Sequence, residues 1–96
     1  MVIEWLTFDV AEDERAEWLL VEENVWSRFL EAQAGFVRKQ MWVEVDDPGR
    51  VHAVIWWNSL EEWKRITPET VIEVDGRMGA FFRACTMRVF DVVRDS

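Results

Sequence analysis

The stretch that decides the fold is VHAVIWWNSLEEW, residues 51–63. Its first seven residues are almost wholly apolar, a length and composition typical of a buried β-strand. Asn58 and Ser59 end this strand, and Ser59 followed by Glu62 matches the capping box that begins a helix. The stretch therefore predicts a strand that leads directly into a short helix.

The sequence on either side of this stretch divides into five further elements. The Asp46–Gly49 segment carries turn chemistry and joins two apolar runs into a hairpin. Gly35 closes a long segment with helical periodicity, and Pro68 fits the first turn of another helix. We predict strands over residues 1–9, 36–45, 51–57 and 84–93, and helices over residues 11–34, 60–66 and from Pro68 onward.

With the two helical pieces on either side of Thr67-Pro68 counted as one, the order of these elements is βαββαβ. This order is that of the ferredoxin-like α+β fold, whose four antiparallel strands lie in the spatial order 4-1-3-2 with the helices on one face. A chain of 96 residues is too short to divide its apolar residues between two cores. We therefore expect one domain over residues 1–96.

Composition and charge exclude several classes of protein. Half of the residues are hydrophobic, which excludes intrinsic disorder, and no apolar run approaches the ~20 residues of a membrane span. The formal net charge of −8 repels nucleic acids and anionic lipid surfaces. A single cysteine and an N-terminus without signal-peptide features favour a reducing compartment. We expect a cytoplasmic protein that binds neither nucleic acids nor membranes.

Both faces of the strand over residues 51–57 are apolar. Val51, Ala53 and Ile55 point to one side of the sheet, whereas Val54 and Trp56 point to the other. Two helices cover only one face of a four-stranded sheet, and the predicted loops are too short to cover the second. Left uncovered, this face would expose an apolar patch of roughly several hundred Å², and a patch of that size marks an interface. The sequence therefore predicts a homodimer.

The long helix carries an acidic residue inside its apolar face. Glu22 lies between two apolar stripes that together span about half of the helix surface. Burial would raise its pKa and suit it to proton transfer. The alternatives are a solvated position at the rim of the face or an ion pair with Arg38 or Arg88.

Several segments together resemble the antibiotic-biosynthesis-monooxygenase-like family. They are Gly35-Phe36 at the start of a strand, the Asp46-Asp47-Pro48 turn, and the run from Val54 to Trp63. The resemblance implies a homodimeric α+β barrel in which two sheets pack face to face. It also implies a ligand cleft in each subunit between the sheet and the helices. Known activities in the family range from cofactor-free oxidation of polyaromatic quinols to haem degradation.

The sequence departs from the haem-degrading branch of this family at three positions. That branch uses an Asn on the first strand, a Trp on the helix after the third strand and a His on the following helix. This sequence has Leu6 and Thr7, Ile66, and no His over residues 67–83 at the corresponding places. We therefore predict no haem and no other cofactor.

Other chemistry has little support in the sequence. One His, one Cys and scattered carboxylates do not build a metal site. His52 and Cys85 lie on strands separated by the first strand, which prevents a nucleophile pair.

Two functions remain open. The first is the binding of a small hydrophobic or aromatic ligand in the cleft between sheet and helices. The second is cofactor-independent oxygenation or isomerisation of a planar aromatic molecule there, with Glu22 as the base. For each aromatic residue that would form a wall of the cleft, ordinary core packing is the alternative. These residues are Trp26, Trp57, Trp63 and Phe82.

Overall fold

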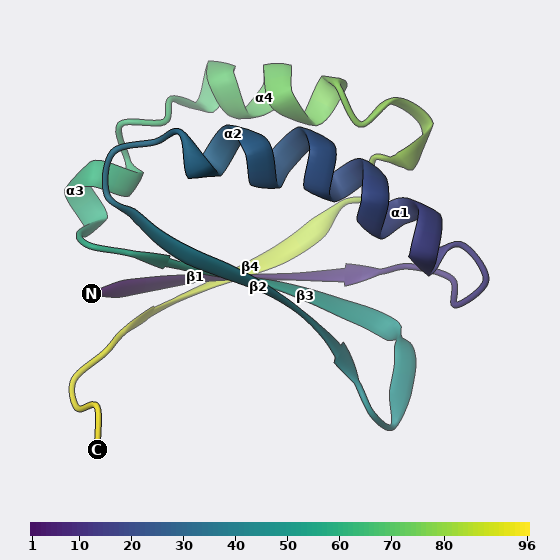
Figure 1. Cartoon of the computed structure of the whole chain (residues 1–96), viewed down its shortest axis with the longest axis horizontal. Coiled ribbons are helices and arrows are strands. Elements are labelled where there is room, and N and C mark those ends of the chain that lie inside the picture. Colours follow the sequence, from purple (N-terminus) through teal and green to yellow (C-terminus); the bar gives the residue numbers. More distant parts are fainter.

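The computed structural model describes all of residues 1–96 and consists of one antiparallel sheet with helices on one of its faces (Figure 1). The strand order β2-β3-β1-β4 is the predicted order, and the α+β ferredoxin-like fold is confirmed. The strands are β1 (Val2–Asp9), β2 (Phe36–Glu44), β3 (Asp47–Trp57) and β4 (Cys85–Asp91).

The helical layer contains one long helix with a change of geometry in its middle. This helix consists of α1 (Arg15–Glu22), a π-helical turn η1 (Glu23–Ser27) and α2 (Arg28–Glu31). It starts later than the predicted residue 11, because Ala11 to Glu14 form a turn. The remaining helices are α3 (Leu60–Trp63), α4 (Pro68–Gly76) and the 3₁₀ turn η2 (Gly79–Phe81).

Side-chain caps begin both short helices. The Ser59 hydroxyl accepts a hydrogen bond from the Glu62 backbone N–H at 3.1 Å, as the capping box predicts. In a complete capping box the Glu62 carboxylate would also accept from the Ser59 backbone N–H. Here it accepts from the Ser59 hydroxyl instead, at 3.0 Å. Thr67 caps α4 by accepting from the Thr70 N–H at 3.2 Å, with Pro68 in the first turn.

The β2–β3 hairpin turns earlier than the sequence predicts. Its turn residues are Val45–Asp46 rather than Asp46–Gly49, and Glu44 pairs with Asp47 across the turn. The register then shifts, which indicates a bulge at the start of β3. Pro48 falls in this bulge, where its missing N–H costs the ladder no hydrogen bond. Of the predicted turn segment, Asp46 therefore lies in the turn itself, whereas Pro48 and Gly49 belong to the bulge.

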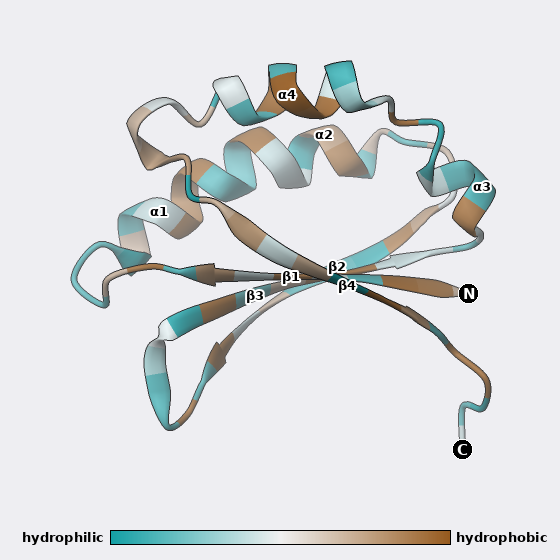
Figure 2. Ribbon diagram, turned by 180° about the vertical axis from the view of Figure 1, so that it is seen from behind, coloured by the Kyte–Doolittle hydropathy of each residue, from teal (hydrophilic) through white to brown (hydrophobic).

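The core lies between the sheet and the helices. Figure 2 shows hydrophobic residues along the strands, and the helix-facing row of β3 is almost completely buried. The opposite row of β3 faces the side of the sheet on which Figure 1 shows no helix. The predicted division of β3 into two largely apolar rows is confirmed. The buried helix-facing residues of β3 are Val51, Ala53, Ile55 and Trp57.

Gly35 is expected to tolerate no side chain. Its φ is +86°, and an added Cβ would lie 2.5 Å from the Glu62 Cβ. We expect Gly35→Ala to lower the free energy of unfolding by about 2 kcal/mol or more, measured by urea denaturation. Gly76→Ala is the matched control, because nothing lies within 4 Å of its position in α4. The control should be neutral or slightly stabilising, and equal stabilities of the two variants would refute this explanation.

Candidate functional site

Charged side chains lie between the sheet and the helices, where apolar residues usually form the core. Glu4 on β1 and Lys39 on β2 are both register partners of Ile55, so all three point toward the helices. Glu22 enters the same layer from α1 and is buried. Buried charges are costly unless they are paired or neutralised, so their presence marks this layer as a candidate site.

Glu4 is held by a tryptophan of the neighbouring strand. The Trp57 Nε1–H donates to Glu4 Oε1 at 3.1 Å. Burial raises the pKa of the Glu4 carboxyl, and the Trp57 hydrogen bond and the Lys64 charge oppose that rise. Glu4 is not among the site residues predicted from the sequence, although it alternates with Leu6 and Phe8 on the apolar face of its strand.

A second carboxyl group is held in the same way on the helical side. The Trp26 Nε1–H donates to Asp75 Oδ1 at 2.9 Å and links η1 to α4. Burial raises the pKa of Asp75. Burial also raises the pKa of the Cys85 thiol, and the charges of Asp75 and Glu4 raise it further. Cys85 is therefore kept as a thiol and is a poor nucleophile.

The layer between sheet and helices is open along β4. Met87 and Val89 are paired with Leu6 and Glu4 and therefore face the helical side of the sheet. They are nevertheless 51% and 48% exposed, because no helix covers them. Exposed apolar side chains thus lie beside Glu4 in the sheet, with Val89 as its direct register partner.

The structure distributes the four predicted aromatic wall residues unequally. Trp57 and Trp26 each hold one of the two carboxyl groups. Trp63 is buried in the same hydrophobic cluster as Trp57, with the Lys64 ammonium 4.1 Å from its ring centroid. Phe82 is half exposed on the segment before β4. Their role in ligand binding stays a prediction.

Glu22 is buried and paired. It is 4% exposed, and its carboxylate forms an ion pair with the Lys39 ammonium. The partner is neither Arg38 nor Arg88, because the edge strand points Lys39 toward the helices. Burial lowers the pKa of Lys39, and the Glu22 charge opposes that change. Loss of either partner would leave an uncompensated buried charge, at a cost of about 3–5 kcal/mol. The role of Glu22 as a general base stays a prediction.

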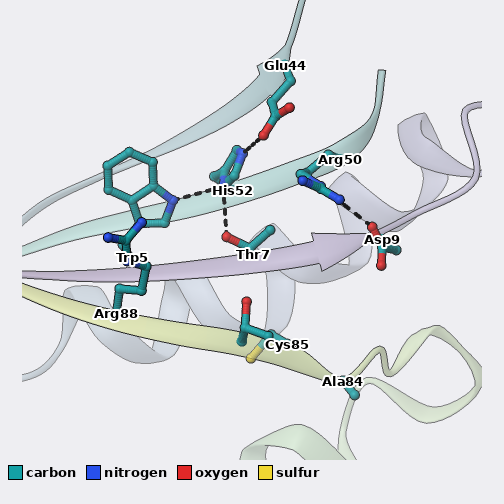
Figure 3. Close-up of a pocket in the computed structure, with 10 residues that line it drawn as sticks. Trp5, Thr7, Asp9, Glu44, Arg50, His52, Ala84, Cys85 and Arg88 are labelled. Atoms are coloured by element: carbon teal, nitrogen blue, oxygen red, sulfur yellow. Dashed lines mark hydrogen bonds and ion pairs between the residues drawn. The ribbon is translucent and has the colours of Figure 1, made fainter. Parts of the chain in front are cut away.

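The open face of the sheet carries a hydrogen-bonded histidine (Figure 3). The Trp5 Nε1–H donates to His52 Nδ1 at 2.8 Å, and the His52 Nε2 lies 2.9 Å from Glu44 Oε1. An indole N–H can only donate, so Nδ1 is the acceptor and Nε2 carries the proton given to Glu44. The Thr7 hydroxyl also lies 3.0 Å from Nδ1. His52 is thereby fixed in one neutral tautomer with its lone pair occupied.

A cavity of about 590 Å³ lies on this open face and includes both His52 and Cys85 in its lining. Figure 3 shows the Cys85 sulfur pointing away from His52, and β1 separates their strands as the sequence predicts. The two side chains do not form a nucleophile pair. No group of three or more His, Cys, Asp or Glu residues is placed to hold a metal ion. None of the helices has the length and apolar composition to cross a membrane.

Solved structures share this arrangement of strands and helices, although neither protein-family models nor curated proteins match the sequence. A point mutant of SnoaB, a cofactor-independent oxygenase from Streptomyces nogalater, is 21% identical, with a TM-score of 0.76 over 98% of this chain and 94% of the other. A protein provisionally named antibiotic biosynthesis monooxygenase, from Deinococcus radiodurans, is 11% identical, with a TM-score of 0.75 over 100% and 96%. This chain has the fold of the antibiotic biosynthesis monooxygenases.

A third structure of an antibiotic biosynthesis monooxygenase agrees with these two. It is 12% identical, with a TM-score of 0.70 over 98% of this chain and 100% of the other. The resemblance read in the sequence to the antibiotic biosynthesis monooxygenases is thus confirmed in the fold. Identities this low describe the architecture, so the chemistry of the site has to be argued from this chain's own residues.

Glu4 is expected to make stability depend on pH. Its raised pKa means that the folded state favours the protonated carboxyl. The protein should therefore lose stability as the pH rises from the pKa of an unfolded glutamate through the higher folded pKa. Glu4→Gln keeps the acceptor for Trp57, and we expect it to remove this loss and stabilise the fold at pH 7 by up to about 1 kcal/mol. Urea denaturation at several pH values measures both effects.

The matched control for Glu4 is Glu61→Gln, because the Glu61 side chain is 85% exposed. This control should change stability by less than about 0.5 kcal/mol and keep the pH profile of the unmodified protein. A Glu4→Gln profile identical to that of the control would contradict a raised pKa at Glu4.

Proposed function

We propose that this protein binds a small aromatic molecule between the sheet and the helices. The observation that carries the proposal is the Glu4 carboxyl, which lies on the helix-facing side of β1 and is held by the Trp57 N–H. A purely structural core has no need of such a group, and burying it costs free energy. A second carboxyl, Asp75, is held by the Trp26 N–H at a partly exposed position on α4. Ligand sites commonly combine apolar walls with a few placed polar groups of this kind.

The chemistry of these groups indicates the class of ligand. A carboxyl group with a raised pKa donates a hydrogen bond when protonated and accepts one when ionised. It can therefore pair with a phenolic hydroxyl or with a quinone carbonyl. The exposed Met87 and Val89 side chains offer apolar contact to a flat ring that approaches along β4. A planar aromatic molecule that carries one or two hydroxyl or carbonyl oxygens on its ring fits both features.

A second candidate function is cofactor-independent oxidation of such a molecule. Its support is the position of Glu4, a carboxylate in apolar surroundings with a raised pKa, which makes it a stronger base than an exposed glutamate. Glu4 would take the proton of a phenolic O–H and leave an electron-rich phenolate for reaction with O₂. The cofactor-independent oxygenase of similar fold favours this candidate. Isomerisation would begin with the same proton transfer to Glu4. Glu22, the base expected from the sequence, is held in an ion pair with Lys39 and is less suited to this role.

We also propose that the chain works as a homodimer joined through the open face of the sheet. Aromatic rings cross this face from β2 to β4, with Trp5 and Trp42 centroids 5.1 Å apart and Trp5 and Phe90 centroids 5.6 Å apart. Trp42 is 38% exposed although it is the largest type of apolar side chain. The face also carries arginines and acidic residues that a second copy can pair. They are Arg38, Arg50 and Arg88 with Asp9 and Glu44.

Ligand binding is tested with 2-naphthol, a flat phenol that does not oxidise readily. We expect saturable binding by isothermal titration calorimetry, at least tenfold weakened by Met87→Arg, which places a charge on the approach along β4. Val93→Arg is the matched control, because Val93 lies beyond β4 and is 93% exposed. Equal affinities of the two variants, or no binding by the unmodified chain, would refute the proposed site.

The dimer is tested by light scattering at micromolar concentration. The unmodified protein should show twice the subunit mass of 11.5 kDa. Trp42→Glu places a charge in the aromatic face and should give a folded monomer, because the dimer would have to desolvate that charge. Leu20→Glu is the control, since Leu20 is exposed on the helical side, and it should stay dimeric. A folded, monomeric unmodified protein would disprove the assembly.

A further inference from the structure

A separate cavity lies at the opposite edge of the sheet from β4. Its volume is about 600 Å³, and it is bounded by the long helix on one side and β2 on the other. Leu19, Phe36 and Met41 form an apolar wall, and a polar inner wall lies beside them. This volume is within the range of small-molecule sites.

The hydrogen bonds of the inner wall are incomplete. The Lys39 ammonium donates to Glu22 Oε2 and, at 2.9 Å, to the Ser27 hydroxyl. Lysine has three N–H donors, so one donor remains. Glu22 Oε1 is buried and has no partner. Leaving such an oxygen unpaired costs about 1–3 kcal/mol, so a native protein is expected to supply a partner for it.

The helix geometry contributes to this arrangement. The π-helical turn η1 begins directly after Glu22 and ends at Ser27, so both polar groups of the inner wall lie at its boundaries. A π turn shifts the phase of the residues that follow it, and such turns recur at functional sites. Here Ser27, the last residue of the π turn, points its hydroxyl toward the Lys39 ammonium.

The charges around the cavity are paired with one another. Arg28 pairs with Glu23 and Glu31, Lys39 pairs with Glu22, and the Arg38 guanidinium lies over the Trp56 ring on the open face. An ionic ligand therefore finds no unpaired charge of opposite sign. The inner wall offers one acceptor and one donor, which the NH₂ and C=O groups of a primary amide match within one planar group. The charged lining residues are Glu22, Glu23, Glu31, Arg28, Arg38 and Lys39.

We propose that this cavity binds a small uncharged primary amide. Because Glu22 Oε1 lies just beneath the cavity surface, the side chains that cover it move aside on binding. The amide NH₂ then donates to Glu22 Oε1, the amide oxygen accepts from the Lys39 ammonium, and the apolar remainder lies against Leu19 and Phe36. This site is independent of the aromatic site along β4, because the two lie at opposite edges of the sheet.

The experiment is an NMR titration of the full ¹⁵N-labelled chain with benzamide. We expect saturable shifts of backbone amides over residues 19–28 and 36–41, and none over residues 85–91. Benzoate should bind at least tenfold more weakly, because it has no donor and would face the Glu22 carboxylate. Absent or non-saturable shifts, shifts confined to β4, or equal affinity for benzoate would overturn the proposal.

Cavity-filling variants locate the binding. Leu19→Trp should weaken benzamide binding at least tenfold, whereas Leu20→Trp, at an exposed neighbour outside the cavity, should keep the affinity of the unmodified chain. If Leu19→Trp does not fold, Val37→Trp makes the same test from the edge strand. Unchanged affinity in the folded cavity-filling variant would overturn the site.

Discussion

The third strand carries apolar side chains on both faces, and the helices of the chain can cover only one of them. Val51, Ala53 and Ile55 are buried against the helical layer. On the other face Val54 is also buried, beneath side chains of the sheet itself. The open face therefore has its own aromatic layer, in which Trp5 contacts rings from three strands, and this layer lacks an outer cover.

The layer between sheet and helices deals with its buried charges in two ways. At Glu4, burial disfavours the charge and raises the pKa, while the Trp57 N–H partly compensates, which leaves a carboxyl group that can exchange a proton. Glu22 is stabilised by the Lys39 ammonium, which leaves one carboxylate oxygen without a partner. The first arrangement suits proton transfer, whereas the second suits recognition of a hydrogen-bond donor. The fold thus separates Glu4, which is suited to proton transfer, from Glu22, which is suited to accepting a hydrogen bond.

The sequence predicts the architecture well because the alternation of apolar residues and the Ser59 cap are local signals. It misplaces the hairpin turn because Pro48 and Gly49 suit a bulge as well as a turn. Glu4 was available to sequence analysis, since it alternates with Leu6 and Phe8. The sequence alone does not identify Lys39 as the partner of Glu22. That contact joins a helix to an edge strand and depends on tertiary packing.

The most direct test of this account concerns what covers the open face of β3. An isotope-filtered NOE experiment on a 1:1 mixture of labelled and unlabelled chains reports only contacts between copies. We expect intermolecular NOEs from the rings of Trp42, Trp56 and Phe90, which the sheet register places on the open face. Intermolecular NOEs confined to the helical side, or none at concentrations where the chain is folded, would contradict it.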